Sequence, residues 1–500
     1  MKHFARLLGL IFALLMLVAA FAACGGAPEA TEGIPETDPP AQETEGDDEI
    51  RDTVPADLRF DGETVTFFVR NDSDLWKYEM DVDTIMNDTL YDAIYYRNKT
   101  VEERLGVTIT TIAQAGSYSN RTAWNDTLRT AVNTKLSDFD GAAIYMSTGS
   151  ALAVEGTYYN VIDFPHVSLD SPWWNQSIQG ELTLFNTLYY LAGDMVITET
   201  AAGNALFYNK DLLEKYYNGV DLYAEVENMT WTIDRLYELV AGVHEDTNAD
   251  GIVSDGDVVG YREGDVDGND GSRDAWVSAM GIDLTTMVNG QPELSFYSSR
   301  TVEAHGKVRK LVSQNPGTLA MTNAVTTTFG NGYALFSPGE LNMGSQLRDM
   351  ESRYGVLPLP MFEENQEGGY RTVCTNNASL VTILSSLSSD RKELVGATLE
   401  LMAAESYRQV RPAYFEVALK SKYAEEPADA KMYDIILDSF SFSFGYCYST
   451  ESLGGIGAYF RHLNVDIAEV WGENGDRHEE LLTKLIDSLD EASFKAQYGE

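Results

Sequence analysis

ETVTFFVR, residues 63–70, is a run of apolar and β-branched side chains that predicts a buried β-strand. Apolar residues at helical spacing follow over residues 84–105, and a second strand pattern follows over 107–112. A helix pattern over 124–134 then leads to a third strand over 139–146. Strands that alternate with helices are typical of a parallel sheet covered by helices. This stretch therefore predicts an α/β fold.

Strand and helix patterns also alternate later in the chain, in segments of different sequence. The body after residue 59 is long enough for two or three lobes. Strands are predicted over 205–209, 329–338 and 374–384, a strand pair or crossing segment over 187–195, and helices over 210–217, 231–244, 300–314, 390–404, 406–419, 428–440 and 477–490.

The first 26 residues, MKHFARLLGLIFALLMLVAAFAACGG, have the layout of a secretory signal. Lys2 and Arg6 give a positive start, residues 7–17 are apolar, and small residues precede Cys24. The cysteine at the cleavage site resembles a bacterial lipobox. That resemblance implies a signal peptide over 1–23 and a lipid-modified Cys24 that holds the protein at a membrane surface. An ordinary signal peptide followed by an unrelated cysteine is the alternative.

Residues 24–59 are rich in Pro, Glu, Asp and Thr and contain few large apolar side chains. Such a composition cannot bury enough surface to fold. We therefore predict a disordered acidic tether between the lipidated cysteine and the folded body.

The chain has 78 acidic and 35 basic residues, which gives a net charge of -43. A protein this acidic is unsuited to nucleic acid, whose phosphates require clusters of Lys and Arg. No second apolar segment approaches membrane-spanning length after residue 26, so the body is not a permease. We expect Cys374 and Cys447 to be free and buried, although an oxidising compartment would allow them to pair.

Four motifs in the body resemble the extracytoplasmic solute-binding proteins of ABC importers, in the maltose-binding-like class that captures sugars and oligosaccharides. They are LFYNKDLLEKY (206–216), MTWTIDRLYELV (229–240), GNGYALFSPGE (330–340) and YGVLPLP (354–360). Each motif alone is weak. Their order, behind a lipobox and an acidic tether, makes the resemblance specific, and it covers nearly all of residues 60–500.

The resemblance implies a two-lobed periplasmic-binding-protein-like fold of type II, with hinge crossings and C-terminal helices. Lobe 1 would comprise residues 60–195 plus 366–440, and lobe 2 would comprise 196–365 plus 441–500. A monomer of this kind closes on a solute by hinge motion, docks on a membrane permease and performs no covalent chemistry.

Sugars present apolar faces and many hydroxyls, so their sites combine aromatic rings with polar side chains. Ligands of open α/β sheets bind at the carboxyl ends of strands. These rules select Arg70, Asn71, Asp72, Ser147, Thr148, Ser337 and Gly339 at strand ends, with Trp173, Trp174 and Tyr446 as aromatic partners and Trp76 and Tyr78 as further aromatic candidates. Core packing is the alternative role for any one of these rings.

Residues 246–257, DTNADGIVSDGD, resemble the calcium loops of EF-hands and dockerins. Glycine occupies position six, where the loop turns sharply, and Asp replaces the usual Glu at position twelve. The predicted ligands of a structural calcium ion are Asp246, Asn248, Asp250, Ile252 through its carbonyl, Ser254 and Asp257. An acidic exposed turn is the alternative. A dockerin has two such loops in tandem, and this chain has one.

Other functions remain open from the sequence. A secreted glycoside hydrolase would use two carboxylates, but with 78 acidic residues such pairs carry no information. The chain has no G-x-S-x-G, H-E-x-x-H or P-loop motif. A peptide or another small solute could also be the ligand. We predict a non-enzymatic binding protein.

Overall fold

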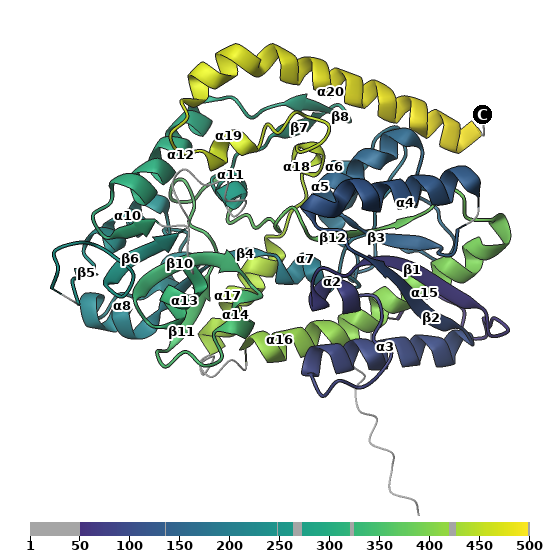
Figure 1. Cartoon of the computed structure of the whole chain (residues 1–500), viewed down its shortest axis with the longest axis horizontal. Coiled ribbons are helices and arrows are strands. Elements are labelled where there is room, and N and C mark those ends of the chain that lie inside the picture. Colours follow the sequence, from purple (N-terminus) through teal and green to yellow (C-terminus); the bar gives the residue numbers. More distant parts are fainter. Residues whose placement is uncertain are drawn as a thin grey trace, which may run out of the picture. The chain divides into compact units, whose positions relative to one another are not determined.

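The computed structural model describes residues 51–135, 137–247, 249–263, 273–320, 325–419 and 427–498. Its first sheet has the strand order β12-β3-β1-β2 and lies on the right of Figure 1. The strands are β1 (Thr64–Arg70), β2 (Thr108–Gln114), β3 (Gly141–Tyr145) and β12 (Ser379–Ile383). β1 runs parallel to β2 and β3, while β12 joins the edge antiparallel to β3. The predicted parallel α/β core is confirmed.

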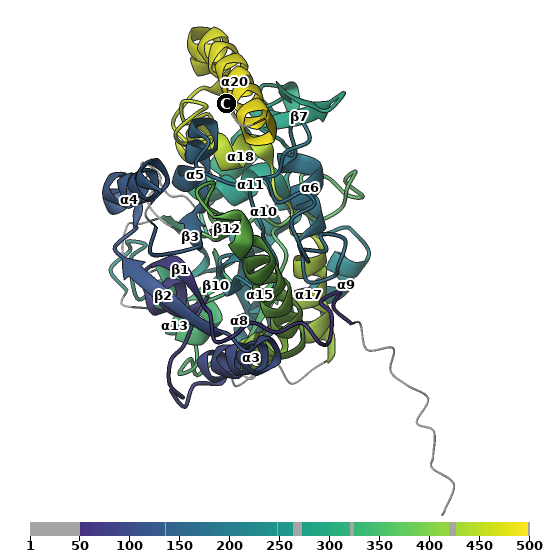
Figure 2. The same cartoon turned by 90° about the vertical axis from the view of Figure 1, so that its right-hand side faces the viewer.

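Helices cover this sheet because neighbouring side chains of a strand point to opposite faces. Phe68 stacks on Trp124 of α4 (Arg121–Thr134), with ring centroids 3.9 Å apart. α3 (Thr89–Leu105) and α15 (Lys392–Glu405) pack together, as Figure 2 shows, with α3 beside β2 and α15 beside β1.

α3 has well-defined ends. The Asp88 carboxylate accepts hydrogen bonds from the amides of Leu90 and Tyr91, and Gly106 ends the helix with a φ of 69°.

The second sheet has the order β11-β4-β10-β6-β5, with β9 also paired to β6. Its strands are β4 (Asn204–Asn209), β5 (His244–Glu245), β6 (Val258–Glu263), β9 (Thr318–Ala320), β10 (Ala334–Glu340) and β11 (Tyr354–Leu357). The two motifs quoted first, residues 206–216 and 229–240, contain most of α8 (Lys210–Tyr217) and α10 (Ile233–Ala241). Thr232 caps α10, as its position predicts, by accepting a hydrogen bond from the Arg235 amide. β7 (Thr285–Val288) and β8 (Gln291–Leu294) form a separate hairpin.

Three passages of the chain lie side by side between the two sheets. Gly203, just before β4, pairs with Cys374, which precedes β12. Thr372 on that second passage pairs with Phe440 on the third. We call these three passages the hinge strands. They are the crossing segments that the resemblance implies, and Cys374 among them is free and buried, as is Cys447.

The remaining helices connect and cover the two sheets. They are α2 (Asp74–Tyr78), η1 (Tyr118–Asn120), α5 (Met146–Gly149), η2 (Ser150–Glu155), α6 (Gln176–Leu182), α7 (Ile197–Ala201), α9 (Leu222–Glu227), α11 (Asp274–Ala279), α12 (Ser299–Arg309), η4 (Lys310–Gln314), α13 (Val325–Gly330), α14 (Met343–Gln346), η5 (Ser389–Arg391), η6 (Ser406–Val410), α16 (Arg411–Leu419), α17 (Pro427–Asp438), α18 (Phe444–Tyr448), α19 (Ala458–Arg461) and α20 (Ile467–Tyr498).

The C-terminal helix α20 contacts elements on both sides of the hinge strands. It packs against η2 beside the first sheet and against α12 and β8 on the other side, along the top of Figure 1. The Ser493 hydroxyl lies 2.6 Å from the hydroxyl of Thr187. α17, in turn, packs on β11 of the second sheet. The lobe boundaries given above stay a prediction.

Two predicted strands differ from the observed ones. Residues 187–195 form isolated bridges, such as Leu191 with Val381, in place of a continuous strand pair. Residues 329–330 end helix α13, and β10 starts only at Ala334, because the Gly-rich turn between them reverses the chain with Gly332 at a φ of 80°.

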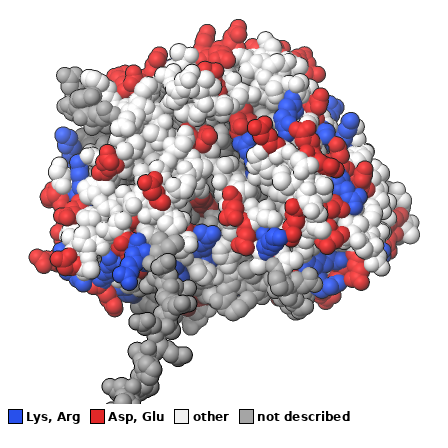
Figure 3. Space-filling view, turned by 180° about the vertical axis from the view of Figure 1, so that it is seen from behind, with Lys and Arg blue, Asp and Glu red and all other residues white. Residues whose placement is uncertain are grey.

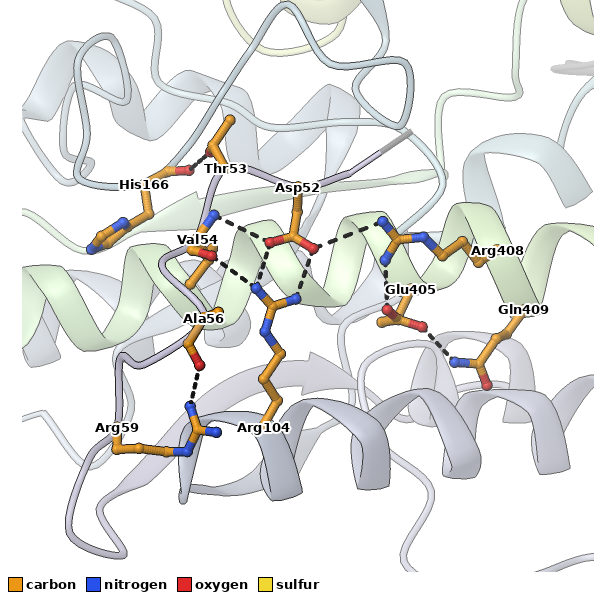
Figure 4. Close-up of polar contacts among 10 residues, drawn as sticks. All are labelled: Asp52, Thr53, Val54, Ala56, Arg59, Arg104, His166, Glu405, Arg408 and Gln409. Carbon is orange, nitrogen blue, oxygen red and sulfur yellow. Dashed lines mark hydrogen bonds and ion pairs between the residues drawn. The ribbon is translucent and has the colours of Figure 1, made fainter. Parts of the chain in front are cut away.

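The described N-terminal segment is held against the body at Asp52 (Figure 4). Its carboxylate accepts two hydrogen bonds from Arg104 of α3, at 2.7 and 2.8 Å, and lies 3.8 Å from Arg408. Val54 is buried nearby. This end of the predicted tether therefore packs on the folded body. The signal peptide and Cys24 lie outside the described residues.

Charge is spread over the surface in Figure 3, where acidic side chains are scattered across the face with lysines and arginines among them. None of the described helices is both long and apolar enough to cross a membrane.

Candidate functional site

A shallow pocket, whose space is about 400 Å³ including the part open to solvent, lies on the hinge strands. Its wall combines apolar side chains with hydroxyls and charges. The lining residues are Asp274, Val277, Ser278, Ile282, Asp283, Leu284, Arg371, Val373, Ser441, Ser443, Tyr446 and Gly457. We call it the hinge pocket.

Two ion pairs border the hinge pocket. Arg461 donates two hydrogen bonds to the buried carboxylate of Asp274, at 2.6 and 2.5 Å. Arg371 forms an ion pair with Asp283. Burial raises the pKa of Tyr446 well above its usual value, so this phenol stays neutral and can donate a hydrogen bond. Tyr446, one of the predicted ligand residues, thus lies in the wall of a real pocket.

A second polar group lies at the carboxyl end of β1. Arg70 is buried, and its Nη2 donates to the Asn377 carbonyl at 2.7 Å and to the Ser379 hydroxyl at 2.8 Å. The rings of Trp76 and Tyr145 cover its guanidinium, with centroids 4.3 and 5.0 Å from Cζ. We call these three residues the Arg70 cluster.

Arg461 acts electrostatically on both groups. Burial raises the pKa of Tyr145, while the positive charges of Arg70 and Arg461 act to lower it. The charge of Arg461 likewise acts on Tyr446. The charge of Arg461 therefore acts on one phenol of the Arg70 cluster and on one phenol of the hinge pocket. Aromatic rings, hydroxyls and fixed charges gather in these two groups, which is the chemistry expected for binding a polyhydroxylated solute.

The other predicted residues of the first sheet have different surroundings. Ser147 and Thr148 of α5 are buried, and their hydroxyls have no hydrogen-bond partner among the described residues. Asn71 is exposed, and Asp72 accepts a hydrogen bond from the Gly116 amide, which connects the ends of β1 and β2.

Three of the remaining predicted ligand residues, Ser337, Trp173 and Trp174, are buried, and Gly339 is half-buried. Ser337 on β10 is buried and donates to the Arg262 carbonyl at 3.3 Å, while a side chain at Gly339 would collide with Met343. Trp173 and Trp174 are buried, and Trp174 donates from Nε1 to Glu400 at 2.9 Å. No contact joins these four residues to the Arg70 cluster in the part of the chain that is described, and their role in binding stays a prediction.

A second pocket holds two buried carboxylates beside Trp173 and Trp174. Burial raises the pKa of Asp194 to about 6, opposed by Arg411, whose Nη1 lies 3.7 Å away. Burial also raises the pKa of Glu199 to about 7, opposed by a hydrogen bond from the Asn175 amide group. These carboxyl groups therefore take up protons near neutral pH.

We expect Glu199 to make the folded state less stable as pH rises. Its pKa rises from 4.5 to about 7 on folding, so between these values the folded state retains a proton that the unfolded chain releases. Stability is therefore lost across that window, by ~3 kcal/mol at full ionisation. Glu199→Gln removes this loss.

Chemical unfolding of wild type and Glu199→Gln at pH 5 and pH 8 checks this expectation. The variant should gain stability relative to wild type at the higher pH. A difference in unfolding free energy that does not change with pH would contradict it.

The predicted calcium loop has the turn that such a loop requires. Gly251 has a φ of 78° at position six. Asp246 accepts hydrogen bonds from the amides of Asp250 and Gly251, and Asp257 accepts from the amides of Thr247 and Ser254.

These bonds hold the oxygens of Asp246 and Asp257 against backbone amides of the loop, and calcium binding stays a prediction. Asn248 lies outside the described residues. Within the described ranges, no three His, Cys, Asp or Glu side chains are grouped as metal ligands.

Several residues of the site had no signal in the sequence. Asp274 and Arg461 lie in different helices, and Ser379 and Asn377 reach Arg70 from more than 300 positions away along the chain. Tyr145 is the last residue of β3 and the next to last of the predicted strand 139–146, so the strand-end rule that selected Arg70 could also have selected it.

Comparison with known proteins supports the fold. No protein-family model matches the chain, and no curated protein matches its sequence. Among solved structures, the GacH receptor of Streptomyces glaucescens is 14% identical, with a TM-score of 0.52 over 84% of this chain and 99% of GacH.

Two further structures are similar. A cyclo/maltodextrin-binding protein is 12% identical, with a TM-score of 0.51 over 87% of this chain and 98% of its own. An ABC transporter solute-binding protein from Thermotoga lettingae is 13% identical, with a TM-score of 0.51 over 86% of this chain and 100% of its own. The chain therefore has the two-lobed α/β fold of the maltose-binding-type solute-binding proteins.

Proposed function

We propose that this protein captures a sugar or oligosaccharide outside the cytoplasm and delivers it, unchanged, to the permease of an ABC importer. The observation that carries this proposal is the hinge pocket, which lies on the three hinge strands and whose Tyr446, like Tyr145 of the Arg70 cluster, is acted on by the charge of Arg461. Similar structures add support, since they were solved in complex with acarbose, maltotetraose and α-D-tagatose.

The geometry suits capture without chemistry. Tyr446, Ser441 and Ser443 present hydroxyls to the pocket, and the ion pair of Asp274 with Arg461 fixes a charged acceptor and donor beside them. Trp76, which is half-buried, offers ring surface for the apolar face of a sugar. Rotation about the hinge strands would bring both sides onto the solute and exclude water.

A thermal-shift screen against neutral and charged mono- and oligosaccharides tests the proposal. A solute at about 100 times its dissociation constant stabilises the protein by ~2.7 kcal/mol, which raises the melting temperature. Absence of any stabilising sugar, or turnover of a sugar into products, would reject the proposal.

Tyr446→Phe then tests the location of the site. The variant loses the Tyr446 hydroxyl together with its hydrogen bond to Asp274, and we expect affinity for the identified sugar to fall about tenfold, because the sugar loses one hydrogen bond. Tyr297→Phe, at an exposed ring away from the pocket, is the matched control and should bind like wild type. Equal affinity in the two variants would place the sugar elsewhere.

We also propose that Cys24 carries lipid and holds the protein at the outer face of the membrane through the acidic tether. The lipobox-like sequence supports this. In the producing cell, Cys24→Ser should move the protein from the membrane fraction to the soluble fraction. Retention of the variant at the membrane would reject lipid anchoring.

A calcium ion held by residues 246–257 is the third part of the proposal. Asp246, Asn248, Asp250, Ser254, Asp257 and the Ile252 carbonyl would hold it, and its role would be to stabilise the loop. We expect EDTA to lower the melting temperature and added calcium to restore it, with Asp246→Asn insensitive to both. If EDTA leaves the melting temperature of wild type unchanged, the proposed calcium ion is rejected.

A further inference from the structure

The guanidinium of Arg70 is fixed in position, but two of its three nitrogen atoms make no hydrogen bond among the described residues. Only 1% of the residue is exposed, and Nη2 is held by the Asn377 carbonyl and the Ser379 hydroxyl. Nε and Nη1 are buried and, among the described residues, have no hydrogen-bond partner. A buried donor without a partner is costly, and a buried charge is more so.

The nearby carboxylates do not form an ion pair with Arg70. Glu79 is the acidic group whose charge acts most strongly on it, but the two Glu79 oxygens accept hydrogen bonds from Ser379 and Thr198, and burial raises the Glu79 pKa. Asp72 is exposed and accepts from the Gly116 amide. Within the described ranges, no carboxylate oxygen lies within ion-pair distance of Arg70.

Two other arginines already form ion pairs with acidic residues. Arg461 is paired with Asp274, and Arg121 is paired with Glu451 at 2.9 Å. Both charges nevertheless act on Tyr145, as does that of Arg70. The charges of three guanidinium groups therefore act on one phenol, in a chain whose acidic residues outnumber its basic ones by more than two to one.

We propose that the captured solute is an acidic sugar whose carboxylate, as in a uronic acid, pairs with Arg70. This deepens the proposed function and rests on it. The buried hydroxyls of Ser147 and Thr148, also without partners among the described residues, would take sugar hydroxyls beside the anion. Trp76 is half-buried whereas Tyr145 is buried, so Trp76 is the more exposed of the two rings that cover the guanidinium.

The test compares sugars that differ only in charge. Titration calorimetry at pH 7 uses oligosaccharides of galacturonate, glucuronate and mannuronate, their methyl esters, the neutral galacto-, gluco- and manno-oligosaccharides, and a sulfated galacto-oligosaccharide. We expect one uronate to bind at least about tenfold more tightly than its ester, because the ester loses the charged hydrogen-bond acceptor.

Arg70→Gln should abolish this preference, leaving acid and ester within about threefold of each other. Arg129→Gln is the matched control, since Arg129 is a partly exposed arginine on α4 paired with Asp126 and Glu155, and it should keep the preference. If Arg70→Gln does not fold, the wild-type comparison of acid with ester still decides.

Each outcome has one meaning. Binding of neutral sugars or esters as tight as that of any uronate overturns the acidic-sugar inference and leaves the proposed function standing. Binding of the sulfated sugar alone overturns the carboxylate assignment. If no sugar binds at all, the proposed function fails and the inference fails with it.

Discussion

Arg97→Met should destabilise the protein by ~3–5 kcal/mol, because it leaves several buried acceptors without their donor. Arg97 is completely buried in α3. Nη1 donates to the carbonyls of Glu79 and Met195 and to the Ser406 hydroxyl, and Nη2 donates to the Met80 carbonyl at 2.7 Å. One side chain thus joins α3 to the loop after α2, to the chain before α7 and to η6.

Arg353→Met is the control for Arg97→Met. Arg353 pairs with Asp211 and Glu214 at the surface, and pairs of this kind are worth ~0–1 kcal/mol. Denaturant unfolding of the two variants and wild type gives the comparison. If Arg97→Met lies within about 1 kcal/mol of Arg353→Met, the buried contacts of Arg97 do not stabilise the fold as described.

Gly396→Ala should also lose ~3 kcal/mol or more, since an added methyl group in a packed interior forces the backbone to move. A Cβ at Gly396, inside α15, would lie 1.9 Å from the Pro165 carbonyl oxygen. Backbone atoms cannot turn away as the end of a flexible side chain can. The helix would have to separate from the loop at Pro165.

Gly472→Ala is the matched control, because Gly472 lies inside α20 with no atom within 4 Å of its added Cβ. Alanine is favoured over glycine in a helix, so this variant should gain ~1 kcal/mol. The same substitution therefore acts in opposite directions in two helices. A loss of stability in both variants, or in neither, would contradict the packing at Pro165. Melting temperatures measured at one pH are sufficient to show whether each variant is more or less stable than wild type.

The first sheet could be predicted from local sequence because its signals are local. β1, α3, β2 and α4 follow from periodicity and from the glycine at position 106, and they lie within a few residues of their predicted bounds. The hairpin of β7 and β8 also had a local signal that the sequence reading missed. Asn289 and Gly290 have φ values of 51° and 79°, which suits the two-residue turn that an Asn-Gly pair favours.

The site could be predicted only in part. Arg70 and Tyr446 were selected by strand position and by aromatic character, and they lie in the Arg70 cluster and in the wall of the hinge pocket respectively. Their partners were not predictable, since Asp274 meets Arg461 from another helix, and Thr372 meets Phe440 across the hinge strands. Such pairs depend on how distant segments pack, which periodicity and turn residues do not report.

The helix α20 has a consequence for how tightly any solute can be held. Its 32 residues form a rod of ~48 Å that touches η2 on one side of the hinge strands and α12 on the other. A hinge rotation that encloses the solute would have to bend α20 or shift its contacts with η2 or with α12. The free energy of binding would then equal that of the solute's contacts less the cost of bending or displacing α20. Shortening the C-terminus would therefore change affinity without removing any residue that contacts the solute.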